Sequence, residues 1–151
     1  MGKDSALSFR LIEPKETYLV RHPVLRKGRS LESCAMEGDD DETTLHVGAY
    51  FKNQLIGVMS LMNKNNPNFD EMGQFQLRGM AILEPYQGKG YGEELVNFGE
   101  NLLNEKYKLP FIWLNARERA KNFYLKLGYQ LIGEPFNIDP IGIHYLMIKS
   151  L

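Results

Sequence analysis

The sequence predicts an α+β (mixed α/β) domain, in which hairpins of strands are combined with a few helices and one parallel pair of strands. Short apolar runs with a period of two residues recur along the chain, and helical patterns are few. Two such runs, 74–83 and 111–116, are separated by a helical pattern over 91–106. A helix between two strands is the usual crossover between parallel neighbours, so these two strands are expected to be parallel.

The N-terminal part is expected to hold one strand, one interrupted helix and a loop. Residues 7–13 suit a strand. A helix over 14–25 opens on a proline, which is favourable, but it should break or kink at Pro23 because proline lacks the N–H that the helix needs. Residues 26–43 are irregular and are expected to form a loop or a short helix with loops.

A hairpin of two strands, 44–52 and 55–62, is expected in the middle of the chain, joined at Asn53-Gln54. Alternation places on one face of its first strand Leu45, Val47, Ala49 and Phe51, and on the other face His46, Gly48 and Tyr50. The turn-rich loop 63–73 then leads into the strand at 74–83.

The C-terminal part is expected to add a helix and a final antiparallel pair. Ala120, Phe123, Tyr124 and Leu127 follow a helical spacing, and Gly128 stands where a helix-ending glycine belongs. Residues 129–132 and 143–149 can then close the sheet, with a loop over 135–142 between them.

Composition excludes several classes of protein. The chain has 151 residues, enough for one domain with a proper core, and a net charge of −1 argues against a general nucleic-acid binder. The single cysteine, Cys34, excludes an internal disulfide and a cysteine-rich zinc site, and the three histidines lack metal-ligand spacing. No metal is therefore expected. No apolar run suits a membrane span or a signal peptide, so a soluble, cytoplasmic protein without a membrane partner is expected.

A glycine-rich turn before the helix of 91–106 is the most informative stretch. Gly88, Gly90 and Gly92 alternate within residues 87–92. Glycines let backbone N–H groups converge without Cβ atoms in the way, and the helix start adds unpaired donors and the positive end of its dipole. The turn therefore predicts an anion site, most naturally for a phosphate.

Two nucleotide-binding classes share this arrangement but fail on specific residues. The dinucleotide fingerprint requires a third glycine where Glu93 stands, and no acid ends the strand 111–116 to hold a ribose. A Walker loop requires serine or threonine after its lysine, whereas Lys89 is followed by Gly90.

The run Q-x-x-G-x-G at 87–92, preceded by MAILEP, resembles motif A of the GNAT superfamily of N-acyltransferases. A second run, NARERAKNFYLKLGY at 115–129, is similar to motif B, and the order of expected elements also suits the superfamily. The resemblance covers nearly the whole chain and extends, more weakly, to a small single-domain branch. It implies one domain over residues 1–151, with a twisted, mostly antiparallel sheet whose parallel pair is splayed around a coenzyme site.

The resemblance also implies that acetyl-CoA, or coenzyme A, binds as co-substrate at motif A. In the superfamily the backbone of the glycine turn holds the pyrophosphate, and the preceding strand pairs with the pantetheine arm. Lys89 would add charge to a phosphate, or be an ordinary solvated lysine. The residues expected to contact the coenzyme are Met80, Ala81, Ile82, Gln87, Gly88, Lys89, Gly90, Tyr91, Gly92, Glu93, Asn115 and Asn122.

Tyr124 matches the superfamily tyrosine that protonates the leaving thiolate, and a phenol is a suitable donor in a dry cleft. Its place on an apolar helix face leaves a core role as the alternative. The superfamily often has an asparagine seven residues before this tyrosine, where this chain has Arg117; Asn115 is a substitute for that contact.

A general base is not evident, because the strand 111–116 holds no Asp, Glu or His. His144 is the preferred candidate, since the final hairpin commonly borders the acceptor site in the superfamily. The alternatives are Glu134, His46, a water chain from Gln74 or Gln76, and an amine that arrives already neutral. The acidic run 37–42 would attract a cationic amine, or be a solvated loop.

The function expected from these motifs is transfer of an acetyl group from acetyl-CoA to a primary amine, by direct attack in a ternary complex. The alternative is a non-catalytic acyl-CoA-binding sensor or partner-binding module on the same fold. The expected partner is a small-molecule or peptide amine, and edge strands near the C-terminus would allow a homodimer.

Overall fold

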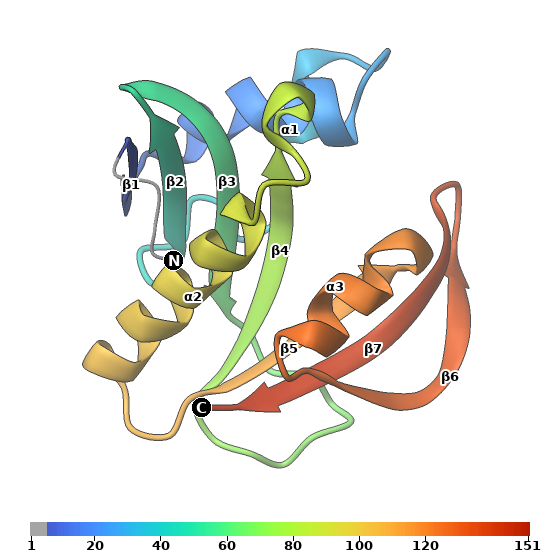
Figure 1. The fold of residues 1–151 in the computed structure, drawn as a ribbon. Coiled ribbons are helices and arrows are strands. Elements are labelled where there is room, and N and C mark those ends of the chain that lie inside the picture. The colour runs from blue at the N-terminus through green and yellow to red at the C-terminus, as the bar shows by residue number, and fades with distance from the viewer. Residues whose placement is uncertain (1–5) are drawn as a thin grey trace.

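A computed structural model describes residues 6–151, which form a single sheet with helices on both faces (Figure 1). The strands, in the sheet order β1-β2-β3-β4-β5-β7-β6, are β1 (Leu7–Leu11), β2 (Leu45–Phe51), β3 (Gln54–Asn63), β4 (Gln74–Ile82), β5 (Phe111–Arg117), β7 (Gly142–Ser150) and β6 (Gln130–Ile138). The α-helices are α1 (Tyr18–Leu25), α2 (Tyr91–Lys106) and α3 (Lys121–Lys126). Single 3-10 turns are η1 (Pro14–Thr17), η2 (Leu31–Cys34), η3 (Glu84–Tyr86) and η4 (Glu118–Ala120).

Strands β4 and β5 form the parallel pair, and α2 connects them, which confirms the predicted fold class. Their pairing is short: it runs from Gln74 with Phe111 to Gln76 with Trp113. Both strands continue beyond that point without pairing, and Figure 1 shows them diverging. The sheet is therefore split between β4 and β5, as the resemblance implied.

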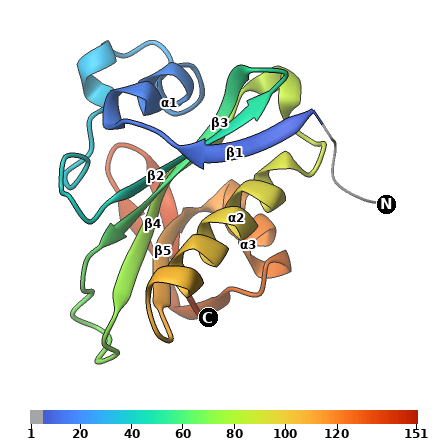
Figure 2. The ribbon, with the colours of Figure 1, turned by 90° about the vertical axis from the view of Figure 1, so that its left-hand side faces the viewer.

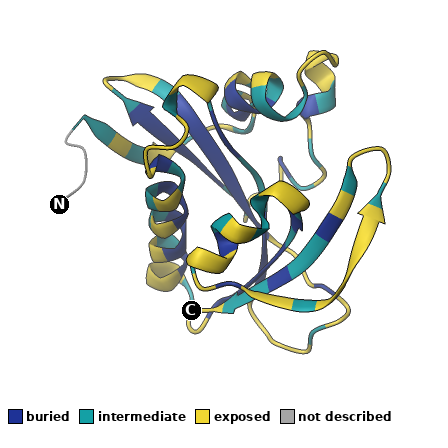
Figure 3. Ribbon diagram, turned by 45° about the vertical axis from the view of Figure 1, so that its right-hand side comes forward, coloured by how far each residue is buried: buried dark blue, intermediate teal, exposed yellow. Residues whose placement is uncertain are grey.

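Helices α1 and α2 cover opposite faces of the sheet, here called the α1 face and the α2 face (Figure 2). Val20 of α1 packs against Val58 and Ala81, whereas Leu95 of α2 belongs to the main core on the other face. Each fully buried side chain of this kind contributes about 1.5–3 kcal/mol. Figure 3 shows the central strands buried and β6 largely exposed at the edge.

A bulge in β4 shapes the split. Pairing between β3 and β4 shifts by one residue between Val58 and Ser60, and Gly79 adopts a positive φ of 61° at the extra position. A Cβ on Gly79 would lie 3.0 Å from Nε of Arg21, so glycine also makes room for that guanidinium. The bulge lies in the part of β4 that has no pairing with β5.

The structure differs from two predictions about proline: α1 does not break at Pro23, and residues 135–138 form part of a strand and not a loop. Helix α1 continues through Pro23 to Leu25. Because Pro23 has no N–H, the carbonyl of Leu19, four residues earlier, has no helical donor. Leu19 is 67% exposed, so water can bind this carbonyl. Strand β6 runs through Pro135, where a loop was predicted, because its pairing with β7 is irregular between Ile132 and Phe136 and needs no N–H there.

The remaining predicted elements are confirmed with small shifts. The turn of the central hairpin lies at Lys52 and Asn53, both with positive φ, one residue earlier than predicted. Residues 26–43 form turns around η2, and Gly128 ends α3 with a φ of 94°.

A buried ionic network attaches the segment after α1 to the sheet. Arg21 is completely buried and donates to both carboxylate oxygens of Asp39, at 2.8 and 3.0 Å. It also donates to the carbonyl of Cys34 and to Oγ of Ser60 on β3. His46 bridges Ser60 and the backbone carbonyl of Asp39 through its two ring nitrogens. These bonds position α1 and residues 34–39 on the α1 face.

Acid should weaken the fold through Asp39. Burial alone would raise the pKa of this carboxyl, but the hydrogen bond from Arg21, with further help from the backbone N–H of Met36, lowers it below its ordinary value. A lowered pKa means that the native state binds fewer protons than the unfolded state. The contribution of Asp39 to the free energy of unfolding is therefore present above about pH 4 and is lost as the pH falls through the folded pKa.

We therefore expect the difference in unfolding free energy between wild type and Asp39→Asn to be large at pH 7 and to shrink progressively below pH ~4. Urea unfolding at several pH values measures it. Asp40→Asn, a change at the exposed neighbour, should not differ from wild type. A difference for Asp39→Asn that is constant with pH would contradict the assignment.

Candidate active site

The splayed end of β4 offers a free strand edge. Residues 77–82 of β4 have no pairing with β5, while Ala81 and Ile82 remain paired with Val58 and Gly57 of β3. Their side chains are buried on the two faces of the sheet. Met80, Ala81 and Ile82 can therefore meet a ligand through the backbone, and an extended ligand would fit as an additional strand.

The glycine turn lies directly after this edge. Gly88 and Gly90 have φ values of 76° and 83°, and a Cβ on either would meet nothing within 4 Å. Glycine is thus required there by the backbone conformation, and the space outside is open. Gly90 is the N-cap of this 16-residue helix and supplies no side-chain cap, so an anion at the helix start would take the place of a capping side chain.

Two contacts hold the turn against the strand. The side chain of Gln87 donates to the carbonyl of Ile82 at 2.7 Å, so this residue supports the turn. A Cβ on Gly92 would lie 2.8 Å from Cε of Met80 and 3.3 Å from the ring of Phe123. Gly92 therefore lets the start of α2 lie close to both β4 and α3.

The other expected coenzyme contacts are more dispersed. Tyr91 is buried, and its ring stacks on Phe51 at a centroid distance of 5.9 Å, so its side chain belongs to the core. Lys89 and Glu93 are exposed around the turn, and Asn122 is exposed on α3. Asn115 lies on β5, on the α1 face.

Tyr124 is buried on the α2 face of the sheet. Its ring makes edge contacts with Phe123 and Tyr129, at centroid distances of 5.0 and 5.6 Å. Its hydroxyl has no hydrogen-bond partner among residues 6–151. Burial raises the pKa of Tyr124 above its ordinary value, so the phenol stays protonated at neutral pH.

The candidate bases fare differently. Both ring nitrogens of His46 are hydrogen-bonded, and the side chain of Gln74 is engaged with the backbone of Asn66 and of the loop before β4. Glu134 is exposed on β6. His144 is buried on β7 opposite Arg117, and its Nδ1 bonds the carbonyl of Gly142, which leaves Nε2 available.

Two acids of the run 37–42 have partners within the protein. Asp39 is paired with Arg21, and Asp41 caps Thr43 within the loop. The sequence hypothesis that the run attracts a cationic amine gains no support from these contacts.

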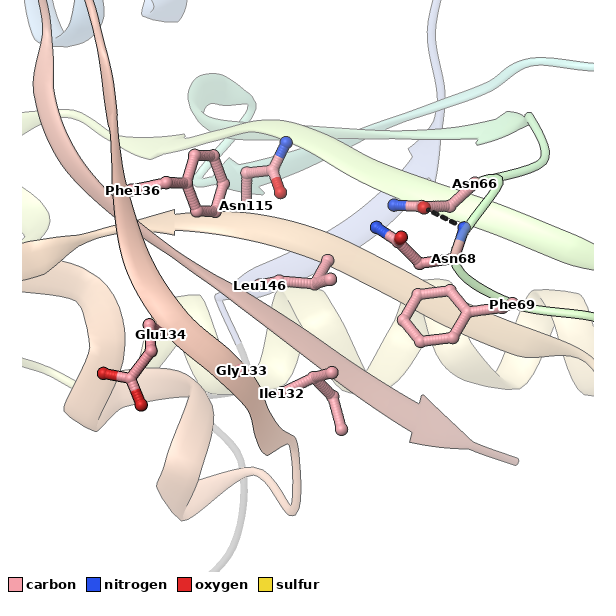
Figure 4. Close-up of a pocket in the computed structure, with 9 residues that line it drawn as sticks. All are labelled: Asn66, Asn68, Phe69, Asn115, Ile132, Gly133, Glu134, Phe136 and Leu146. Carbon is pink, nitrogen blue, oxygen red and sulfur yellow. Dashed lines mark hydrogen bonds between the residues drawn. The ribbon is translucent and has the colours of Figure 1, made fainter.

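An open pocket of about 570 Å³ lies on the α1 face between β5, the β6–β7 hairpin and the loop before β4 (Figure 4). Its lining consists of Asn66, Asn68, Phe69, Asn115, Ile132, Gly133, Glu134, Phe136 and Leu146. In Figure 4 the carboxylate of Glu134 points away from the other lining side chains. The pocket therefore presents amides and apolar groups.

Comparison with known proteins gives a consistent result. The family description "Acetyltransferase (GNAT) domain" matches residues 26–149. The chain is also 37% identical over 145 residues to the uncharacterized N-acetyltransferase YitI of Bacillus subtilis (strain 168), covering 96% of this chain and 97% of that protein. The chain belongs to the GNAT family of acetyltransferases.

Solved structures agree on the fold of this GNAT protein. A putative N-acetyltransferase from Lactobacillus plantarum has a TM-score of 0.79 at 17% identity, covering 97% of this chain and 99% of that one. An aminoglycoside 6'-N-acetyltransferase complexed with coenzyme A has a TM-score of 0.74 at 14% identity, covering 95% and 96%. Within residues 6–151, no helix is both long and apolar enough to cross a membrane.

Two residues on the α1 face of this GNAT domain were not included among the expected site residues. Arg78 lies just before the bulge of β4, and Arg117 ends β5 where the family often has asparagine. The signal for Arg78 was a lone cation inside an apolar strand. Arg117 was recognised as a departure from the motif, but its position on the α1 face became apparent only in the structure.

The glycine turn allows a direct test of the expected coenzyme site. Gly90→Ala should lower stability by about 1–2 kcal/mol, because a side chain disfavours a positive φ, and should weaken acetyl-CoA binding at least about tenfold as the turn relaxes. Gly73→Ala is the matched control, since Gly73 also has a positive φ of 70° with nothing within 4 Å of its Cβ. Calorimetry measures acetyl-CoA binding by both variants, and equal affinity would contradict a coenzyme site at the glycine turn.

Proposed function

We propose that this protein transfers the acetyl group of acetyl-CoA to a primary amine within a ternary complex. The observation that carries the proposal is the free edge of β4 at residues 77–82, which leads directly to the uncapped start of α2. The pantetheine arm would pair with that edge, and the pyrophosphate would accept hydrogen bonds from the turn and helix N–H groups. The family membership and the coenzyme A complex of a fold relative support the same placement.

The reaction then proceeds in one displacement at the thioester. The neutral amine attacks the carbonyl carbon, a C–N bond forms, and the C–S bond breaks as the tetrahedral intermediate collapses. Backbone N–H groups of the β4 edge at Met80 to Ile82 would stabilise the oxyanion. The amine loses a proton, and the departing sulfur gains one.

Tyr124 would serve the departing sulfur. The residue is buried, and its hydroxyl is protonated and without a partner in the described chain, so it is free to donate to the thiolate. His144 would receive the amine proton at Nε2, directly or through water, because its Nδ1 is already held by Gly142.

Calorimetry with acetyl-CoA and with coenzyme A tests the donor half of the proposal, and release of free thiol across a panel of amines tests the transfer. Micromolar binding together with thiol release that depends on an amine is the expected result. No affinity for either coenzyme form would overturn the proposal. Binding without thiol release from any amine would favour the non-catalytic acyl-CoA-binding module instead.

A further inference from the structure

Two arginines lie on opposite sides of the split, on the α1 face. Phe75 and Leu77 of β4 belong to the core on the α2 face, so alternation directs Arg78 to the other face. The same alternation on β5, where Leu114 and Ala116 are in that core, directs Arg117 to the α1 face. Arg78 and Arg117 thus share the face on which the pocket opens.

Both guanidinium groups are half-buried and lack acidic partners. Neither guanidinium forms an ion pair or a hydrogen bond with another residue in the range 6–151. By contrast, the fully buried Arg21 nearby is paired with Asp39. A half-buried guanidinium without a counter-charge is uncommon in a structure, because its desolvation is not compensated.

The surroundings of Arg117 are cationic. Burial lowers the pKa of Arg117, and Arg26, Arg119 and Arg29 lower it further, while no carboxylate raises it. Arg117 remains charged at neutral pH in spite of this. Three cations from two distant parts of the chain thus add to the positive potential at the end of β5.

Arg78 has a more balanced environment. Burial and the charges of Arg21 and Arg26 lower its pKa, while Asp39 and the exposed Glu37 act in the opposite direction. Asp39 is already paired with Arg21. Glu37, the other of these two acids, has no ion pair among residues 6–151. Arg26 thus lowers the pKa of Arg78 as well as that of Arg117.

A buried amide oxygen in the same region also lacks a partner. Gln76 precedes Arg78 by two residues on β4 and is only 6% exposed. Its Oε1 has no hydrogen-bond partner in the described chain. An ammonium or amide N–H of a bound ligand would satisfy this oxygen, whereas the arginines require an anion.

The coenzyme does not account for these cations. Its phosphates would lie at the glycine turn and at the start of α2, which packs on the opposite face of the sheet. The arginines therefore point to the acceptor.

We propose that the amine acceptor carries an anionic group, a carboxylate or a phosphate, which Arg117 and Arg78 bind on the α1 face. The inference rests on the proposed function and specifies its acceptor. The remainder of the acceptor would lie in the pocket, against Leu146, Phe136 and the amide of Asn115. A pocket of about 570 Å³ suits a small molecule.

Matched pairs of amines test the inference. Leucine is compared with leucinamide, and phosphoethanolamine with ethanolamine, in assays of thiol release from acetyl-CoA. At least one anionic member should exceed its neutral partner in kcat/KM by about 10- to 100-fold, the range expected for hydrogen bonds to a charged group. The pair that shows the difference identifies the carboxylate or the phosphate as the anion.

Arg117→Gln and Arg78→Gln should each remove most of that preference by raising the KM of the anionic amine, with the KM of acetyl-CoA unchanged. Glutamine keeps part of the aliphatic side chain, and thermal unfolding verifies that the variants are folded. Arg119→Gln is the control, because Arg119 is exposed beside the same region. It should change the preference by less than about threefold.

The outcomes separate the inference from the proposed function. Neutral amines that react as well as their anionic partners, with Arg117→Gln equal to wild type, overturn the inference and leave the acetyltransferase intact. If no amine leads to thiol release, calorimetry measures whether leucine or phosphoethanolamine binds to the coenzyme A-loaded protein. If the anionic amine binds to wild type and not to Arg117→Gln, the anion site is supported without the transfer reaction. If neither leucine nor phosphoethanolamine binds, both the anion site and the transferase proposal are overturned.

Discussion

Replacing Tyr124 by phenylalanine should lower kcat by at least about 100-fold while the affinity for acetyl-CoA stays within about twofold of wild type. The change removes one hydroxyl and keeps the ring, whose edge contacts with Phe123 and Tyr129 stabilise the core. Because the hydroxyl has no partner among residues 6–151, its loss leaves no other polar group unsatisfied. Stability should therefore be preserved.

The measurement combines thiol release with calorimetry on the same preparations. Tyr107→Phe is the matched control: Tyr107 follows α2, its ring packs on Phe75, and it lies outside the proposed site. It should retain wild-type kcat. A Tyr124→Phe enzyme with undiminished turnover would remove Tyr124 from the mechanism and leave it a core residue.

The pH dependence should carry the same signature. Since burial raises the pKa of Tyr124, its ionisation should not reduce the rate below about pH 10. The rate should instead rise with pH as the amine acceptor loses its proton. A decline in kcat between about pH 8 and 9, absent in Tyr124→Phe, would show that the phenol ionises early.

The second large effect is expected on stability. Arg21→Met should lower the free energy of unfolding by about 3–5 kcal/mol, because Asp39 is left as a buried charge without its partner. The substitution also removes donors to the carbonyl of Cys34 and to Ser60. Such a loss is a large fraction of the stability of a typical domain. Urea unfolding at pH 7 measures it.

Two companion variants identify the cause. Arg21→Lys keeps the charge but cannot donate to both oxygens of Asp39, so its loss should be smaller. In the double variant Arg21→Met with Asp39→Leu, no charge is left buried, and part of the stability should return. If the double variant equals the sum of the single changes, the ion pair is not the source of the effect.

The same network has a bearing on activity. Arg21 packs against Gly79 at the bulge of β4, and the buried Nε of Arg21 has no partner in the described part of the chain. A folded variant at Arg21 should therefore also bind acetyl-CoA less well, because the strand edge would shift.

Local sequence was sufficient to predict the backbone of the proposed coenzyme site. Gly88 and Gly90, which the sequence placed in a tight turn, both adopt a positive φ, and α2 begins and ends where it was predicted. Backbone conformation at such positions depends on the residue itself and its immediate neighbours, so it can be predicted without tertiary contacts. The same holds for Gly128 at the end of α3.

Sequence alone determined the fold class, the parallel pair around α2 and the two GNAT motifs, because these depend on periodicity and on residues close together in the chain. The tertiary structure decided what distant residues do for one another. It paired Asp39 of the acidic run with Arg21, gave both nitrogens of His46 structural partners, and placed Arg117 and Arg78 on one face without counter-charges. Charge compensation depends on which segments fold together, and one-dimensional spacing does not contain that information.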